Sequence, residues 1–407
     1  MVKGRKTSSH SNTETRTERK ITINLSSTII GGFLILAIGV FVGANWNGMF
    51  SQFMPYLGFK NTASVDWTGL NEVYNKLLSN YDGSVSEQNA IEYAKKGIAA
   101  SVGDKYTTYM TASEAADFDK SLHGEVGAGI GVVMAERDGY TRVVRTLPDN
   151  PAQRAGILAG DIIYKINGEE VYNLDTNTIA TKLRGNAGES VSLTIVRNGE
   201  EITYDLIREE INNVSAYIEY SGNTAIITVT RFDTDTGTIV KDFVKDFSAK
   251  GINKVILDLR DNGGGYVSAA RDLLSLWIDS EAVLIQKSIH FPDETTYALH
   301  GQATLSNMRT IVLINGSTAS ASEIVAGALK NYHKATLVGE KTFGKGVVQS
   351  LIKLSNNTML KVTTAHWYTP NGDTINGTGI EPDKEIVRTY DDINASRDPQ
   401  LDNALAM

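Results

Sequence analysis

The stretch Asn315–Glu323, NGSTASASE, restricts what this chain can fold into more than any other part of it. An apolar, β-branched run, Thr310–Ile314, precedes the stretch and predicts a buried strand, and apolar residues at helical spacing follow it. We therefore expect a sharp strand-to-helix junction built from small residues. Such a junction lets a substrate backbone approach, and the free N–H groups of the first helical turn can hold a developing negative charge. A serine-rich helix cap is the alternative interpretation.

A serine nucleophile needs a base, and a lysine follows at a suitable distance along the chain. Lys345 stands between Gly344 and Gly346, after a second apolar run, Ala335–Val338. Strand, serine, helix, strand and lysine form a predicted βαβ path, which brings Ser320 and Lys345 to one end of a sheet. A phosphate-binding loop is the alternative for the Gly-Lys-Gly sequence, but that motif needs a spaced upstream glycine and a following Ser or Thr.

Lysine acts as a base only when its pKa is lowered, and burial lowers the pKa because a low dielectric disfavours the ammonium form. We expect Phe343 and residues 347–348, both valines, to provide this burial. Gln349, four residues after Lys345, is placed to orient the amine.

These two motifs resemble those of the carboxy-terminal processing (tail-specific) serine protease family. The resemblance implies that Ser320 and Lys345 form a Ser-Lys dyad, assisted by Gln349. A third block, LDLRDNGGG over residues 257–265, also resembles the family, although a glycine triplet after a buried strand is in addition an ordinary loop signal. The resemblance implies an oxyanion hole formed by backbone N–H groups of this triplet and of the residue after the serine: Gly263, Gly264, Gly265 and Ala321.

Residues 123–210 form a separate β-rich module, which resembles the PDZ domains of such proteases. Four strand-like segments alternate with a short helix that ends on glycines, and Leu174–Leu183 predicts a second helix. The resemblance implies a peptide groove in which the N–H groups of Gly129, Ile130 and Gly131 receive a C-terminal carboxylate while the peptide adds as a strand. Arg184 is expected either to sense the peptide or to pair on the surface. A module used only for packing is the alternative.

The amino terminus predicts a membrane anchor. Six Lys or Arg residues against two Glu occur in the first twenty positions, and no charged residue lies between Ile21 and Phe59. The apolar segment over residues 25–45 is long enough to span a bilayer, and the preceding basic residues place the N-terminus in the cytoplasm. A cleaved signal peptide is the alternative, since small residues end the segment, but its apolar core is long for a signal.

The length of 407 residues predicts two or three domains, and the predicted elements together with the resemblance imply an α+β multidomain protein. The 407 residues include no cysteine, which excludes disulfides, thiolate metal sites and a cysteine nucleophile, and the net charge of −8 argues against general nucleic-acid binding. The predicted order is a basic tail, transmembrane helix, linker, helical segment, PDZ domain, α/β Ser-Lys protease core with βαβ units, and C-terminal tail. Their ranges are 1–24, 25–45, 46–63, 64–122, 123–210, 211–390 and 391–407.

The resemblance implies a cell-membrane, single-pass serine endopeptidase whose catalytic domain lies outside the cytoplasm and processes the C-terminal tails of proteins. No cofactor or metal is expected. The expected partners are proteins or peptides with accessible C-termini and the membrane, with a homo-oligomer or an activating partner also compatible. One alternative is a surface adaptor with an inert protease domain. A Ser-His-Asp protease is another, but none of the six histidines lies in a matching block, and a zinc protease lacks its His-Glu-x-x-His motif.

Overall fold

The computed structural model describes residues 66–125, 127–137, 139–395 and 397–407. The predicted basic tail, membrane anchor and linker lie outside these residues. Within the described ranges, no helix combines the length and the apolar character that crossing a bilayer requires. The described residues before Glu87 belong to one unit, which holds helix α3 (Thr68–Asn80), and those from Glu87 onward belong to another.

The second unit begins within the predicted helical region, 64–122, where α4 (Glu87–Ala100) and α5 (Ala112–Leu122), like α3 in the first unit, confirm the helical periodicity. Thr111 caps α5, since its hydroxyl accepts from the Glu114 N–H and the Glu114 carboxylate accepts from the Thr111 N–H. Between the two helices lies strand β1 (Thr108–Met110), which pairs with β18 (Met359–Tyr368). The residues before α5 are therefore part of a sheet, whereas the sequence pattern indicates only a break between helices.

The β-rich module contains an antiparallel sheet in the order β3-β4-β5-β7-β8, and β6 also pairs with β5. The helix predicted over Leu174–Leu183 is confirmed as α7, and Ile163, Leu193 and Ile195 are fully buried in the core. The β8 strand is absent from the predicted set, although its apolar residues alternate with polar ones. The elements are β2 (Ala128–Gly129), β3 (Val132–Arg137), β4 (Tyr140–Thr146), α6 (Pro151–Arg154), β5 (Ile162–Ile166), β6 (Glu169–Glu170), α7 (Thr176–Leu183), β7 (Ser190–Arg197), β8 (Glu200–Ile207) and β9 (Glu209–Glu210).

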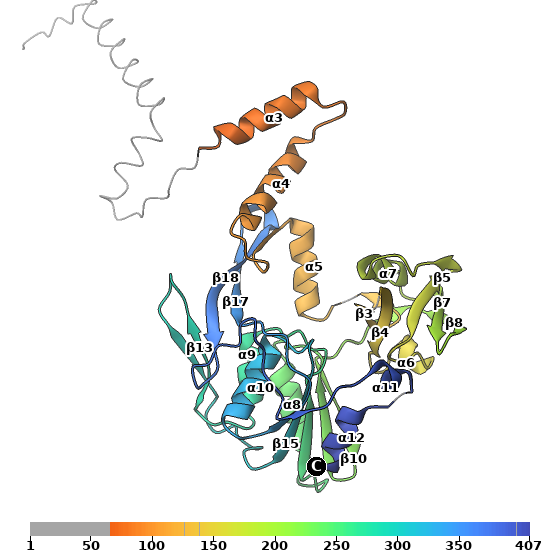
Figure 1. The fold of residues 1–407 in the computed structure, drawn as a ribbon, viewed down its shortest axis with the longest axis vertical. Helices are drawn as coiled ribbons and strands as arrows, with labels where there is room; N and C mark the ends of the chain where they lie inside the picture. Colours follow the sequence, from red (N-terminus) through yellow and green to blue (C-terminus); the bar gives the residue numbers. More distant parts are fainter. Residues whose placement is uncertain (1–65, 126, 138, 396) are drawn as a thin grey trace, which may run out of the picture. The chain divides into compact units, whose positions relative to one another are not determined.

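The carboxy-terminal module is an α/β layer structure around a sheet in the order β10-β11-β12-β15-β16-β19 (Figure 1). All neighbouring strands from β11 to β19 are parallel, and β10 is antiparallel to β11. The elements are β10 (Ala216–Ser221), β11 (Thr224–Val229), α8 (Thr236–Val244), β12 (Lys254–Asp258), α9 (Val267–Leu274), β15 (Arg309–Ile314), α10 (Ala321–Asn331), β16 (Thr336–Gly339), β19 (Lys384–Glu385), α11 (Tyr390–Asn394) and α12 (Pro399–Ala406).

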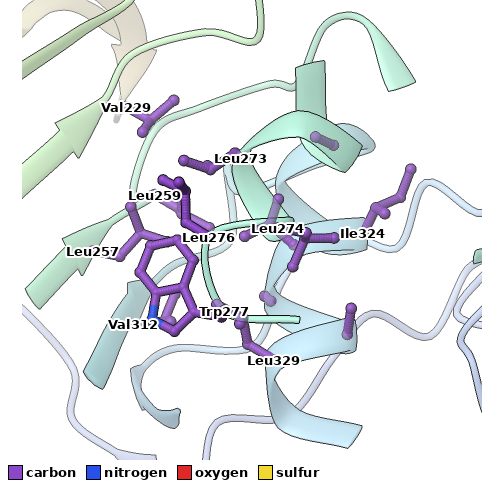
Figure 2. Packing of buried hydrophobic residues seen from close by; sticks show 14 of the residues in the cluster. Val229, Leu257, Leu259, Leu273, Leu274, Leu276, Trp277, Val312, Ile324 and Leu329 are labelled. Carbon is purple, nitrogen blue, oxygen red and sulfur yellow. The ribbon is translucent and has the colours of Figure 1, made fainter. Parts of the chain in front are cut away.

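Alternating residues of this sheet bury its two faces against different helices. Leu257 and Val312 belong to the core cluster that includes residues of α8, α9 and α10, and Figure 2 shows them beside Trp277. Ile256 and Ile311 belong to a cluster on the other face, to which α12 contributes Ala404. Burial on both faces explains why these strands read as continuous apolar runs rather than as alternating ones.

A second sheet lies beside this layer and contains β1, β18, β13 and β14, with β17 paired to β18 (Figure 1). The remaining bounds are β13 (Ala282–Lys287), β14 (Glu294–Tyr297), β17 (Val347–Lys353) and the short helix η2 (Ser355–Asn357). Because β12, β15 and β16 are parallel, the loops at their carboxyl ends meet at one edge of the first sheet. These loops carry the glycine triplet, Ser320 and Lys345, so the predicted βαβ path is confirmed.

Candidate active site

Ser320 occupies a strained turn between β15 and α10. Its backbone has φ of 56° and ψ of −117°, a combination that non-glycine residues rarely adopt, and α10 begins at the next residue. Strain of this kind persists only where the surrounding structure holds it, and it gathers at functional sites. The turn confirms the predicted strand-to-helix junction.

The Glu323 carboxylate, which is completely buried, joins the serine turn to the lysine loop. Its Oε2 accepts the N–H of Ser320 at 2.8 Å and the N–H of Lys345 at 2.9 Å. Its Oε1 accepts the Thr342 hydroxyl at 2.6 Å and the N–H of Gly344 at 2.7 Å. The backbones of the two predicted catalytic residues are thus held by one side chain. Glu323 is not among the site residues predicted from the sequence, although an acidic residue three positions after a helix N-cap is a recognisable signal.

Asn262, also fully buried, attaches the glycine loop to the serine turn. Its carbonyl accepts the N–H of Ala319 at 3.0 Å and the hydroxyl of Ser322 at 2.9 Å. The Ser322 side chain is therefore engaged in holding the loop. Gly264 has φ of 103°, and a Cβ at this position would lie 2.8 Å from the Ser320 Cβ. Only glycine permits this close approach.

The backbone N–H groups near Ser320 differ in their partners. The Gly264 N–H donates to Asn262 Oδ1 at 2.9 Å. Among the described residues, no acceptor is found for the N–H groups of Gly263, Gly265 or Ala321. Ala321 is the first residue of α10, whose orphan N–H groups carry the positive end of the helix dipole. Unengaged donors of this kind can bind an oxyanion.

Burial lowers the pKa of Lys345, and the positive charge of Lys361 lowers it further, while Glu323 and Asp104 oppose the shift. The Lys345 ammonium nitrogen lies 5.1 Å from the ring centre of Tyr106. Phe343, which the sequence predicts to help bury Lys345, is 51% exposed, and its ring centre lies 5.6 Å from the ammonium nitrogen of Lys105. Tyr106 comes from the segment before β1, which the pairing of β1 with β18 brings across to the lysine.

Gln349 lies on β17 and donates to the Thr363 hydroxyl at 3.2 Å. The Thr363 N–H in turn donates to Thr107 Oγ1 at 3.1 Å, and the Thr107 hydroxyl donates to Asp104 at 2.6 Å. The glutamine is therefore bonded to β18, at a residue whose backbone is in turn bonded to the segment that supplies Tyr106. No hydrogen bond joins Gln349 to Lys345 among the described residues.

His333 is not placed to act as the base for Ser320. His333 is the histidine nearest to Ser320 in sequence, but it follows the carboxyl end of α10, while Ser320 precedes the amino end. At 1.5 Å per residue, the helix separates them by roughly 16 Å.

The β-rich module contains a groove of about 210 Å³ between the β2–β3 segment and α7. The four predicted peptide-binding residues, Gly129, Ile130, Gly131 and Arg184, all line this groove. Gly131 has φ of 78°, and a Cβ there would lie 2.3 Å from the Asn150 Cβ, so the turn before β3 requires glycine. Strand β3 is at the edge of its sheet, which leaves one side open for an added strand.

Known proteins share both modules. The profile of peptidase family S41 matches residues 223–386, and a PDZ domain profile matches residues 142–197. A "Probable CtpA-like serine protease" of Staphylococcus epidermidis is 33% identical over 329 residues, which cover 80% of this chain and 67% of the relative. A protein of the same description from Staphylococcus aureus is 31% identical over 366 residues, which cover 88% of this chain and 72% of that protein. The solved photosystem II D1 C-terminal processing protease is 25% identical with a TM-score of 0.57, covering 79% of this chain and 87% of that one.

Proposed function

The chain belongs to peptidase family S41, as a serine-type C-terminal processing peptidase with a PDZ domain, and we propose that Ser320 is its nucleophile and Lys345 its general base. One observation carries this assignment: buried Glu323 accepts hydrogen bonds from the backbones of both residues. The lowered pKa of Lys345 supports it, because only the neutral amine can accept a proton.

In the proposed mechanism, the Ser320 hydroxyl oxygen attacks the scissile carbonyl carbon while its proton passes to the Lys345 amine. The carbonyl oxygen becomes an oxyanion, which accepts hydrogen bonds from the N–H groups of Ala321 and of the glycine triplet, where those of Gly263 and Gly265 have no acceptor in the described part of the chain. The Lys345 ammonium then gives its proton to the leaving amine. Water attacks the acyl-enzyme with Lys345 again as base, and the serine hydroxyl is restored.

We further propose that Gln349 supports the lysine. Its amide is held by Thr363, so it presents a fixed dipole at the start of β17, four residues from Lys345. The Tyr106 ring limits the access of water to the same amine. Both groups are held by the segment around Asp104, which therefore belongs to the catalytic arrangement in this proposal.

A direct test uses the full chain and a protein with an unstructured, apolar C-terminal tail. The wild type should shorten the tail, as read by intact-mass spectrometry, whereas Ser320→Ala and Lys345→Ala should each lower the rate at least about 10³-fold. Ser317→Ala, at an exposed position, is the matched control and should keep nearly full activity. If Ser322→Ala is inactive while Ser320→Ala cleaves normally, the nucleophile is assigned to the wrong serine.

We propose that the PDZ groove captures substrate C-termini on the N–H groups of Gly129, Ile130 and Gly131, with Arg184 at its rim. A hydrogen bond to a charged group contributes about 1.5–3 kcal/mol, so amidation of a bound peptide's C-terminus should weaken binding roughly ten-fold or more. Equal affinity for acid and amide peptides would count against capture of the carboxylate.

A further inference from the structure

Arg145, on β4, is a largely buried cation that is only partly satisfied within the described part of the chain. Burial lowers the pKa of Arg145, yet a guanidinium remains charged in proteins. One of its terminal nitrogens, Nη1, is buried and has no hydrogen-bond acceptor in the described part of the chain. A buried charge that lacks a hydrogen-bonded counter-ion is costly, so such a group needs an explanation.

The charged groups that face Arg145 form no hydrogen bond with its Nη1 among the described residues, although the two nearby carboxylates attract it. The nearby groups are the carboxylates of Asp258 and Asp261, the Tyr217 hydroxyl and the Arg231 guanidinium. Asp258 is occupied by Arg260, which donates to its two oxygens at 2.9 and 2.6 Å. The Asp261 carboxylate accepts from the Asn315 amide at 3.0 Å. Arg231 adds a like charge.

Arg145 also lines the peptide groove. Three arginines border this groove, namely Arg145, Arg184 and Arg231, and no Asp or Glu is among the described residues that line it. Arg231 already forms an ion pair with Asp233 at 3.2 Å. In a chain with a net charge of −8, the groove therefore has a local excess of positive charge. Charge complementarity favours an anionic group in the occupant.

The strand register indicates where that group would lie. Arg145 is directly opposite Val133 on β3, two residues beyond Gly131. A peptide that adds to the open edge of β3, with its terminal carboxylate at the Gly129–Gly131 turn, runs antiparallel along Val132 and Val133. Alternate side chains of an added strand point to opposite sides. The C-terminal side chain would then face the apolar groove residues Ile130 and Leu183, and the residue before it would face the side of Arg145.

We infer that the groove selects protein tails with an acidic residue immediately before the C-terminal residue, and that Arg145 forms the ion pair with it. This inference rests on the proposed capture of C-termini by the PDZ groove. It names a substrate class: tails that end in a carboxylate side chain followed by a small or apolar terminal residue.

The test measures binding of labelled peptides to the full chain carrying Ser320→Ala, by fluorescence anisotropy. Peptides with one apolar sequence end in Leu-Ala-X-Ala, where X is Asp, Asn or Lys, and an amidated Asp peptide is included. The Asp peptide should bind at least five-fold more tightly than the isosteric Asn peptide, and the Lys peptide should bind most weakly. Arg145→Gln should reduce the Asp-to-Asn ratio to near one. Arg142→Gln, on the same strand but outside the groove lining, should retain the ratio.

If the protein with native Arg145 binds the Asp peptide less than two-fold more tightly than the Asn peptide, the inference is overturned without any further variant. If the acid peptide still binds better than its amide in that case, capture of C-termini stands and only the role of Arg145 fails. If acid and amide bind equally, the proposed capture itself fails. If Arg145→Gln removes the acid-to-amide difference and leaves the Asp-to-Asn ratio intact, Arg145 binds the terminal carboxylate and the inference is wrong.

Discussion

Glu323 is a positioning residue at the scale of a single side chain. Two oxygens accept four donors, and two of these are the N–H groups of Ser320 and Lys345. A carboxylate can accept at all four sites because both of its oxygens are acceptors. The geometry of the serine turn and that of the lysine loop therefore depend on the same charge.

Glu323→Gln should damage both stability and catalysis. The amide nitrogen would face donors rather than acceptors, and each buried N–H left without an acceptor costs about 1–3 kcal/mol. Replacing one oxygen leaves two donors without an acceptor, so we expect the free energy of unfolding in urea to fall by about 2–6 kcal/mol and turnover to fall at least about ten-fold. Glu381→Gln is the control, because Glu381 is exposed and pairs with Lys341 in the same loop. An active, fully stable Glu323→Gln protein would show that the four bonds are dispensable.

Lys361 tunes the pKa of Lys345 by its positive charge. Removing that charge in Lys361→Gln should raise the pKa of Lys345. The neutral amine would then appear only at higher pH, so the rising limb of the activity profile should move to higher pH while the alkaline plateau is retained. Lys353→Gln, a change at an exposed position on the adjoining strand, should leave the pH at which activity rises unchanged. A shift to lower pH would contradict the assignment of Lys345 as the base.

At the scale of elements, Asp398 links the terminal helix α12 to Arg260, which immediately precedes the glycine loop. Asp398 caps α12 by accepting the N–H of Leu401 at 3.0 Å, and it also accepts from Arg260 at 2.9 Å. Arg260 pairs with Asp258 at 2.6 Å and immediately precedes Asp261 and Asn262 in the glycine loop. Docking of the last helix thus supports the loop that borders Ser320.

Asp398→Ala should therefore lower stability in a pH-dependent way. Burial alone would raise the pKa of Asp398, but hydrogen bonds and charge from Arg260 outweigh it, and the pKa lies below its ordinary value. The stabilisation is present above the unfolded pKa, about 3.9, and disappears as the pH falls through the lower folded value. At pH 7 we expect a loss of about 2–4 kcal/mol in urea unfolding, from a lost cap and a broken, largely buried ion pair.

The difference between wild type and Asp398→Ala should shrink as the pH is lowered below about 4. Asp402→Ala, an exposed change in the first turn of the same helix, should cost only a few tenths of a kcal/mol, as expected for the helix dipole alone. A difference that grows on acidification would exclude the ion pair as the cause.

At the scale of the whole molecule, we propose that the apolar segment over residues 25–45 anchors the chain and that residues 46–407 lie outside the cytoplasm. Six basic residues before this segment favour a cytoplasmic N-terminus. Protease added to intact cells without their wall should digest the protein, leaving a fragment of the first residues and the anchor. Protection of the whole chain, with digestion after the membrane is opened, would place the catalytic domain in the cytoplasm.

The local sequence pattern was sufficient to predict many of the helices, strands and motifs of this protein. The apolar run before Asn315, the small residues around Ser320 and the helical spacing after Glu323 specify a strand, a turn and a helix, because each depends on neighbours within a few residues. The serine and lysine motifs likewise identified the family, which the comparisons confirm. Parallel pairing of β15 and β16 then follows from the short helical crossover between them.

Only the tertiary structure decided what surrounds the lysine. Tyr106 stands far from Lys345 in sequence and reaches it because β1 pairs with β18, while Phe343, two residues away, is about half exposed. The four bonds of Glu323 and the unsatisfied Nη1 of Arg145 are likewise set by segments that meet only in the folded chain. The sequence by itself determined which groups could carry the chemistry, since that depends on residue type and local spacing. Burial, pKa and pairing depend on long-range packing, so they were decided by the fold.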